Sequence, residues 1–251
     1  MTLDELYNAP EFRLEPSNSQ TDNFKFYENP ALGVGYYIPR VTKLLDTIKE
    51  DYLLQWANSL GWKRKSYSRT LQDYAELGSQ VHCEIEMYLK EGEIGVSPGF
   101  KSFLNWWMRL NQDNIITDVQ SEVELICPYF GGTTDLFFKA NGKNCLVDFK
   151  TSKHISYKYI VQLAAYRHMM EERLGEPIDI CIILQLDKYE VVPAMVYTYD
   201  MSNPVVREMF DHAYEYILIL AQGFLYNQYL QNMFNSTSKS VMKEAEGPYE
   251  E

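Results

Sequence analysis

The chain has 251 residues, 46% of them hydrophobic, which is enough to bury a sizeable core as one large domain or two small ones. Its 35 acidic and 23 basic residues give a formal charge of −12, which argues against a protein that binds nucleic acid over its whole surface. The amino terminus has no basic and apolar leader, and no run approaches the length of a membrane span. We therefore expect a cytoplasmic protein without a membrane partner.

The amino-terminal part of the chain predicts an irregular arm followed by helices. Residues 1–35 are polar, acidic and punctuated by Pro and Gly, which indicates the arm. Apolar residues then recur at helical intervals, which predicts helices over 41–60, 71–90 and 98–112.

From residue 121 the pattern changes to that of strands. Alternating, strand-forming runs cover 121–130, 133–140 and 144–152, with breaks at Gly131-Gly132 and Asn141-Gly142. Asn-Gly between two such runs is a strong signal for a hairpin with a two-residue loop.

Helix and strand signals continue beyond the hairpin. Ser156 is a candidate cap for a helix that runs to about Arg173, and Gly175 lies just beyond its end. Two further strands are predicted over 178–188 and 191–200.

Asn203 and Pro204 open a long carboxy-terminal helix that is predicted to end at about residue 233. The acidic segment 234–251 is predicted to be a disordered tail. We therefore expect one domain over 36–233 of mixed α/β class, with a central mixed sheet flanked by helices and extra helices at both ends.

The Asn141-Gly142 loop sets the register of the predicted hairpin. Counting back from it places Asp135 opposite Asp148, with Cβ atoms about 5 Å apart. Lys150 joins these aspartates, because residues two apart on a strand share a face. The opposite face carries an apolar set suited to a core: Leu136, Phe138, Cys145, Val147 and Phe149.

Two facing carboxylates repel each other unless something offsets their charge. A divalent cation does so, and ligation by oxygen alone suits Mg²⁺ or Mn²⁺. The alternative is an exposed hairpin face on which strand twist separates Asp135 from Asp148 and lysines pair with them. The pattern alone leaves both readings open.

The neighbouring helices add polar residues. Lys158, Gln162 and Tyr166 lie one turn apart on a single stripe, so Gln162 is a candidate partner for a phosphate or a metal-bound water, although an ordinary polar helix face has the same spacing. His82 lies among apolar residues, where a lone imidazole is more often a partly buried polar residue than a ligand. Glu122 and Glu124 are left outside the expected ligands, because they share the Asp135 face only if Gly131-Gly132 forms a two-residue loop.

Positive charge gathers in two places. One cluster comprises Lys63, Arg64, Lys65 and Arg69. The other spans 143–170, where Asp148 is the only acidic residue among Lys143, Lys150, Lys153, Lys158 and Arg167. Most such runs are solvated surfaces, and they indicate phosphate contacts only where a site lies between them.

Four motifs in order resemble the PD-(D/E)XK nuclease superfamily: LGSQVHCEIEMYL at 77–89, GGTTD at 131–135, LVDFKTSK at 146–153 and VQLAAY at 161–166. More narrowly they are similar to its RecB-type exonuclease branch. Residues 38–62 are also similar to the amino-terminal region of mitochondrial genome maintenance exonucleases and their phage relatives. The resemblance covers residues 38 to about 200 and implies a restriction-endonuclease-like fold.

The resemblance implies a metal centre. His82, Asp135 and Asp148 would ligate Mg²⁺ or Mn²⁺, and the backbone carbonyl of Phe149 is a candidate further ligand. No iron–sulfur cluster is expected, because the cluster-binding cysteines of some relatives have no counterpart here. The four cysteines, Cys83, Cys127, Cys145 and Cys181, stand singly among apolar residues.

The resemblance also implies roles for other residues. Lys150 would position or activate the attacking water and stabilise charge on the phosphate. Gln162 would orient that lysine, the water or the substrate, and Tyr166 would support the site. Candidate DNA contacts are Lys63, Arg64, Lys65, Arg69, Lys153 and Lys158.

The implied activity is metal-dependent exonucleolytic hydrolysis of single-stranded or end-processed DNA in replication, recombination or repair, in keeping with a phage source. One alternative is a catalytically inactive nuclease fold that binds DNA or assembles with other proteins. Such a protein more often lacks Asp148 or Lys150, and both are present. Another is a glycoside hydrolase, which the adjacent lysine and the cross-strand placement of the aspartates disfavour.

Overall fold

The computed structural model describes residues 2–8, 26–28, 37–48 and 51–245. The chain divides into two compact units. The sheet unit comprises residues 48–125 and 132–214, and the terminal unit comprises 1–47, 126–131 and 215–251. The domain bounds drawn from the sequence remain predictions.

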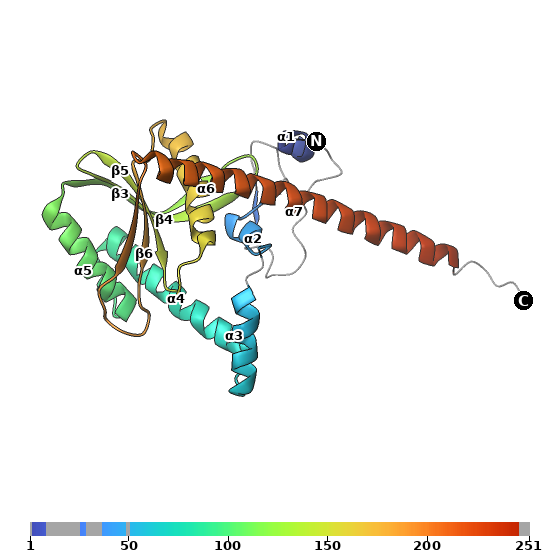
Figure 1. Cartoon of the computed structure of the whole chain (residues 1–251), viewed down its shortest axis with the longest axis horizontal. Helices are drawn as coiled ribbons and strands as arrows, with labels where there is room; N and C mark the ends of the chain where they lie inside the picture. Colours follow the sequence, from blue (N-terminus) through green and yellow to red (C-terminus); the bar gives the residue numbers. More distant parts are fainter. Residues whose placement is uncertain (1, 9–25, 29–36, 49–50, 246–251) are drawn as a thin grey trace, which may run out of the picture. The chain divides into compact units, whose positions relative to one another are not determined.

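A five-stranded mixed sheet organises the sheet unit (Figure 1). Its strands, in spatial order, are β3 (Ile116–Ile126), β4 (Gly131–Ala140), β5 (Lys143–Lys150), β6 (Ile180–Gln185) and β7 (Met195–Asp200). β4 pairs antiparallel with β5, β5 parallel with β6, and β6 antiparallel with β7. The predicted mixed α/β class, with helices flanking a central mixed sheet, is confirmed.

The helices of the sheet unit are α3 (Asp51–Trp62), α4 (Tyr67–Glu91), α5 (Pro98–Asp113), α6 (Tyr157–Leu174) and the start of α7 (Pro204–Ala245). The terminal unit contains α1 (Leu3–Asn8), β1 (Phe26–Glu28), β2 (Tyr37–Pro39) and α2 (Val41–Leu45). β1 and β2 form a small antiparallel pair. In the described part of the chain, no helix combines the length and apolarity needed to cross a membrane.

Helices cover both faces of the large sheet. The face that carries Leu136, Val147 and Phe149 packs against buried residues of α4 and α5, such as Ile85 and Phe103. The predicted apolar face of the hairpin is therefore confirmed as core. Strand alternation turns the remaining buried side chains to the other face, where α6 contacts β5 and β6.

The β4–β5 hairpin has the predicted register, with Ala140 opposite Lys143 and Leu136 opposite Val147. Its loop residues Asn141 and Gly142 have φ of 50° and 82°, as a type I′ turn requires. The predicted start of α6 is also confirmed, because the Ser156 side chain accepts a hydrogen bond from the Lys158 backbone N–H.

The predicted helix over 41–60 was wrong, because the structure contains two helices there, α2 and α3. Thr47 helps to end the first: its backbone N–H and its hydroxyl both donate to the Leu44 carbonyl, at 3.1 and 2.6 Å. At the other end of the chain, α7 continues to Ala245, past the predicted end at residue 233. The first helix-breaking pair after residue 233 in the sequence is Gly247-Pro248.

The predicted break at Gly131-Gly132 was also wrong, because both glycines belong to β4. The chain turns earlier, where the Cys127 backbone N–H donates to the Phe130 carbonyl at 3.0 Å. Gly132 serves a different need. A Cβ atom there would clash with Cε1 of Tyr166, so the absence of a side chain lets β4 and the tyrosine ring approach each other.

Candidate metal centre

Two aspartates lie at the open end of the β4–β5 hairpin. The described ladder ends at Leu136 opposite Val147, and the same register continued by one step sets Asp135 opposite Asp148. Asp148 is 1% exposed, and Asp135 Oδ2 accepts a hydrogen bond from the Phe149 backbone N–H. The hairpin turn thus fixes two carboxylates at the edge of the core.

Helix α4 brings His82 to this pair, and its Nδ1 atom lies 3.2 Å from Asp135 Oδ1. Val81 and Ile85, on either side of the histidine, are buried in the core that α4 shares with the sheet. One turn before His82, a Cβ atom on Gly78 would lie 2.9 Å from the Thr151 hydroxyl, just beyond β5. The small residue lets the helix approach the end of the strand that carries Asp148 and Lys150.

Glu122 on β3 completes a group that the sequence interpretation left incomplete. His82, Glu122 and Asp135 each offer one ligand atom, and these three atoms lie within 4.8 Å of one another. Counting back from the turn between Cys127 and Phe130 brings Glu122 level with Asp135. The sequence interpretation left Glu122 out because it made the placement of this residue depend on a two-residue loop at Gly131-Gly132, whereas the chain turns at 127–130.

The donor atoms fit a divalent cation. A nitrogen from His82 and carboxylate oxygens from Glu122 and Asp135 form the group, and Asp148 adds a second buried aspartate beside it. Asp148 is fully buried, and Lys150 Nζ lies 2.7 Å from its Oδ2 as an ion pair. The ammonium offsets the charge of this carboxylate, so the fit to a divalent cation rests on the donor atoms of His82, Glu122 and Asp135.

Lys150 connects this centre to α6 through a chain of polar contacts. Its ammonium donates to Asp148 Oδ1 and to Gln162 Oε1, both at 2.9 Å, and lies 4.7 Å from the centroid of the Tyr159 ring. The Gln162 amide in turn donates to the Tyr166 hydroxyl at 3.1 Å. The predicted stripe on α6 therefore contacts Lys150 through Gln162, and Tyr159 adds an aromatic face that the sequence interpretation did not include.

The ionisable groups of the centre shift one another's pKa. Burial raises the pKa of Asp148 to about 6, although Lys150 opposes the rise. Burial and the nearby charge of Asp135 raise the pKa of Glu122 to about 7. Burial opposes ionisation of Asp135 and His82 as well, but their mutual attraction prevails, so the pKa of Asp135 is lowered and that of His82 is raised.

The structure places the other residues singled out from the sequence at varied positions. The Phe149 side chain is buried in the core beside the His82 ring, at 5.7 Å between centroids. The Lys158 ammonium donates to the Ile48 carbonyl at 2.7 Å, and Lys153 is exposed. The basic cluster at the junction of α3 and α4 is exposed throughout: Lys63, Arg64, Lys65 and Arg69.

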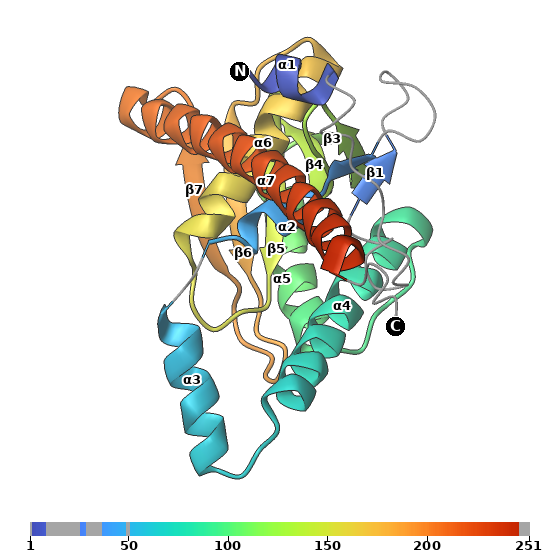
Figure 2. The ribbon, with the colours of Figure 1, turned by 90° about the vertical axis from the view of Figure 1, so that its right-hand side faces the viewer.

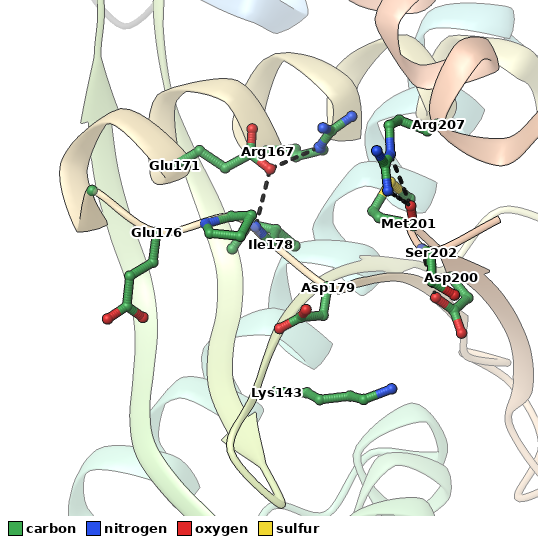
Figure 3. A pocket seen from close by; sticks show the side chains of 12 residues that line it. Lys143, Arg167, Glu171, Glu176, Ile178, Asp179, Asp200, Met201, Ser202 and Arg207 are labelled. Atoms are coloured by element: carbon green, nitrogen blue, oxygen red, sulfur yellow. Dashed lines mark hydrogen bonds and ion pairs between the residues drawn. The ribbon is translucent and has the colours of Figure 1, made fainter. Parts of the chain in front are cut away.

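A pocket of about 560 Å³ lies elsewhere in the sheet unit (Figure 3). Lys143, at the start of β5, contributes to its lining, whereas the metal centre lies at the end of that strand, about 20 Å away at 3.3 Å per residue. The two guanidinium groups that line the pocket already have partners: Arg167 pairs with Glu171, and Arg207 donates to the Met201 carbonyl. None of the catalytic candidates lines this pocket.

No family model and no curated protein matches the chain. Among solved structures, the chain is similar to the protein SSO0001, with 12% identity, a TM-score of 0.37, and coverage of 85% of this chain and 86% of that one. It is also similar to a protein of Eubacterium rectale whose assignment as an exonuclease is provisional. The identity there is 14%, the TM-score is 0.34, and the match covers 59% of this chain and 68% of that one.

Proposed function

We propose that this chain is a metal-dependent nuclease of the PD-(D/E)XK type, which hydrolyses phosphodiester bonds of DNA. The observation that carries the proposal is the constellation at the end of the β4–β5 hairpin. His82, Glu122 and Asp135 have ligand atoms within 4.8 Å of one another, and Asp148 and Lys150 lie on the adjoining strand. The motif resemblance supports the same activity.

The protein side chains would share the chemistry as follows. His82, Asp135 and Asp148 would hold Mg²⁺ or Mn²⁺, and Glu122 would add a carboxylate. When bound, the cation supplies charge withdrawal from the phosphate and a water of lowered pKa.

Lys150 would place its ammonium beside the scissile phosphate. Burial opposes its charge, but Asp148 and Asp135 outweigh that effect and raise its pKa, so the amine remains protonated at neutral pH. A fixed positive charge there stabilises negative charge that develops in the transition state. Gln162 would keep the ammonium in place through its hydrogen bond, and Tyr166 would hold the Gln162 amide.

The expected substrate is single-stranded DNA or DNA with a free end, and the expected mode is exonucleolytic, in replication, recombination or repair. The exposed basic residues between α3 and α4 support a DNA substrate, because phosphate contacts supply most of the affinity for nucleic acid. They also reconcile that substrate with the acidic composition, since positive charge is gathered in particular regions rather than spread over the surface.

The proposal is tested by degradation of end-labelled linear single-stranded DNA in Mg²⁺, in Mn²⁺ and in EDTA. Wild type is expected to degrade the substrate only with metal, and Asp148→Asn and Lys150→Ala are expected to abolish degradation. The exposed residues Asp113 and Lys101 provide matched controls, Asp113→Asn and Lys101→Ala, which should retain full activity. Activity that survives both substitutions in the centre would exclude this site as the nuclease.

Two further measurements separate the alternatives. Closed circular single strands should resist the enzyme, and equal cleavage of circles and linear strands would contradict the exonuclease mode. Calorimetric titration with Mn²⁺ should show binding that Asp148→Asn weakens. Absence of both binding and hydrolysis would favour an inactive nuclease fold.

A further inference from the structure

Helices α3 and α4 follow each other in the sheet unit and are joined by a short connection (Figure 2). Aromatic side chains from both helices and from the loop between β6 and β7 meet near the amino-terminal half of α4. The Trp56 ring of α3 stacks on Tyr74 of α4 at 5.9 Å between centroids and meets Tyr67 edge-on at 5.4 Å. Tyr189, from the loop between β6 and β7, meets Tyr74 edge-on at 6.2 Å. We call these four residues the aromatic cluster.

A lysine is built into the aromatic cluster. Lys188 Nζ lies 4.7 Å from the centroid of the Tyr74 ring and 6.0 Å from that of Tyr189, and it donates to the Tyr74 carbonyl at 3.2 Å. The loop that carries it is held by Asp187, whose carboxylate accepts the backbone N–H groups of Tyr189 and Glu190. The loop therefore presents a ring and a cation together.

The three tyrosines of the aromatic cluster are partly open to solvent. Tyr67 and Tyr74 are each 39% exposed, and Tyr189 is 57% exposed. Clustered aromatic rings that remain this exposed offer flat apolar faces to a ligand, and the bases of a single strand are ligands that stack on such faces. Duplex bases cannot do so, because they are already stacked on their neighbours.

Positive charge adjoins the aromatic cluster on one side, at the junction of α3 and α4. From Lys63 to Gln72 the chain contains no acidic residue, and Lys63, Arg64, Lys65 and Arg69 are all exposed. Asp73 and Glu76 follow on α4, so the positive region is confined to the junction of α3 and α4. A backbone that contacts this junction would place its bases within reach of the rings.

One face of α4 leads from the aromatic cluster to the metal centre. Tyr74, Gly78 and His82 are spaced four residues apart and so lie on one stripe of the helix. Two turns separate Tyr74 from His82, or about 12 Å at 1.5 Å per residue. At about 3.4 Å per nucleotide of a stacked strand, that length corresponds to roughly three or four nucleotides.

We propose that the aromatic cluster is a stacking site for unpaired bases, about three or four nucleotides from the phosphate at the metal centre. The inference rests on the proposed function and specifies its substrate: a strand that is single-stranded for at least this length. The basic junction contacts its phosphates, and the rings of Tyr74 and Tyr189 contact its bases.

The test measures binding of a labelled single-stranded oligonucleotide in EDTA, where no hydrolysis occurs. Tyr74→Leu and Tyr189→Leu should each weaken binding by about fivefold or more, because a stacked base contributes roughly 1 to 3 kcal/mol. Tyr74→Phe and Tyr189→Phe keep the ring and should bind as wild type does. Thermal unfolding verifies that each variant is folded. If Tyr74→Leu does not fold, the exposed Tyr189 carries the test alone.

An oligonucleotide with abasic sites separates stacking from general loss of affinity. Wild type should bind it more weakly than either single leucine variant binds the normal strand, and a variant with both leucine substitutions should bind both strands equally. A leucine variant that binds the normal strand as tightly as wild type, or a wild type that is indifferent to the abasic sites, would overturn the inference.

The same reagents distinguish this inference from the proposed function. Hydrolysis of the small diester bis(p-nitrophenyl) phosphate with Mn²⁺ reports on the metal centre and needs no stacking site, so the leucine variants should retain it. Base-dependent binding without any hydrolysis by wild type would refute the nuclease and leave the stacking site intact. Hydrolysis by wild type together with DNA binding that does not depend on the rings would refute the stacking site and leave the nuclease intact.

Discussion

Binding of Mn²⁺ should depend steeply on pH, because the metal centre must lose protons to accept a cation. Glu122, with a pKa of about 7, and Asp148, with a pKa of about 6, both retain protons at mildly acidic pH. Both pKa values are raised from those of ordinary carboxylic acids, so protonation persists at a pH where free carboxylates are ionised. Cation binding requires the ionised forms and releases these protons.

The size of the effect follows from the two pKa values. A pH of 5 is about two units below the pKa of Glu122 and about one unit below that of Asp148. The ionised fractions of the two carboxyl groups are therefore roughly 0.01 and 0.1. By pH 8 both groups are mostly ionised. The apparent Kd for Mn²⁺ should therefore fall by roughly 1000-fold between pH 5 and pH 8, of which Glu122 supplies about 100-fold. The raised pKa of His82 acts in the same direction.

Isothermal titration calorimetry tests this expectation directly. Titrations at about pH 6 in two buffers of different ionisation enthalpy count the protons released, and more than one proton per cation is expected. Glu122→Gln should reduce that number by about one and leave roughly a tenfold pH dependence. Glu93 is exposed and provides the control Glu93→Gln, which should behave as wild type does. A Kd that is equal at pH 5 and pH 8 would refute the reasoning.

Two predictions concern the stability of the metal-free protein. Because burial and Asp135 raise the pKa of Glu122, its ionised form destabilises the fold above pH 7, and this cost disappears as pH falls towards its ordinary pKa. Glu122→Gln should therefore raise the free energy of unfolding by about 1 to 3 kcal/mol at pH 8 in EDTA and by much less at pH 5; equal gains at both values would contradict the assigned cause. Gly132→Ala should lower the free energy of unfolding by about 1 to 3 kcal/mol, because its Cβ atom would meet the buried Tyr166 ring. Urea denaturation measures the change against Gly61→Ala, where the added atom meets nothing within 4 Å, and an unchanged midpoint for Gly132→Ala would show that the ring moves without cost.

The hairpin was predictable because one short signal determines it. Asn141 and Gly142 require a two-residue turn with positive φ, and that turn sets the register of every pair between β4 and β5. The positions of Asp135, Asp148 and Lys150 at one end of the hairpin follow from the register and the alternation of side chains. The residues of the turn therefore determine where three residues of the candidate site lie.

Glu122 could not be placed in the same way, because glycine has two uses. The Gly131-Gly132 pair resembles a turn, but Gly132 is a strand residue that makes room for the Tyr166 ring. That need arises from a helix more than thirty residues later in the chain, so no local pattern reports it. The division of the predicted helix over 41–60 into α2 and α3 was missed for a related reason, since Thr47 can either continue a helix or end it through its hydroxyl.

The two-residue turn of the β4–β5 hairpin also has a consequence for the order of folding. It brings Asp135 and Asp148 together through a short, local loop closure, whereas His82 arrives on α4, far earlier in the sequence. We infer that the carboxylates meet before the imidazole that offsets their charge is in place. Their repulsion must then be overcome by the apolar face of the same hairpin, which includes Leu136, Val147 and other core residues. The residues that bury this face thus determine whether the acidic pair can assemble at all.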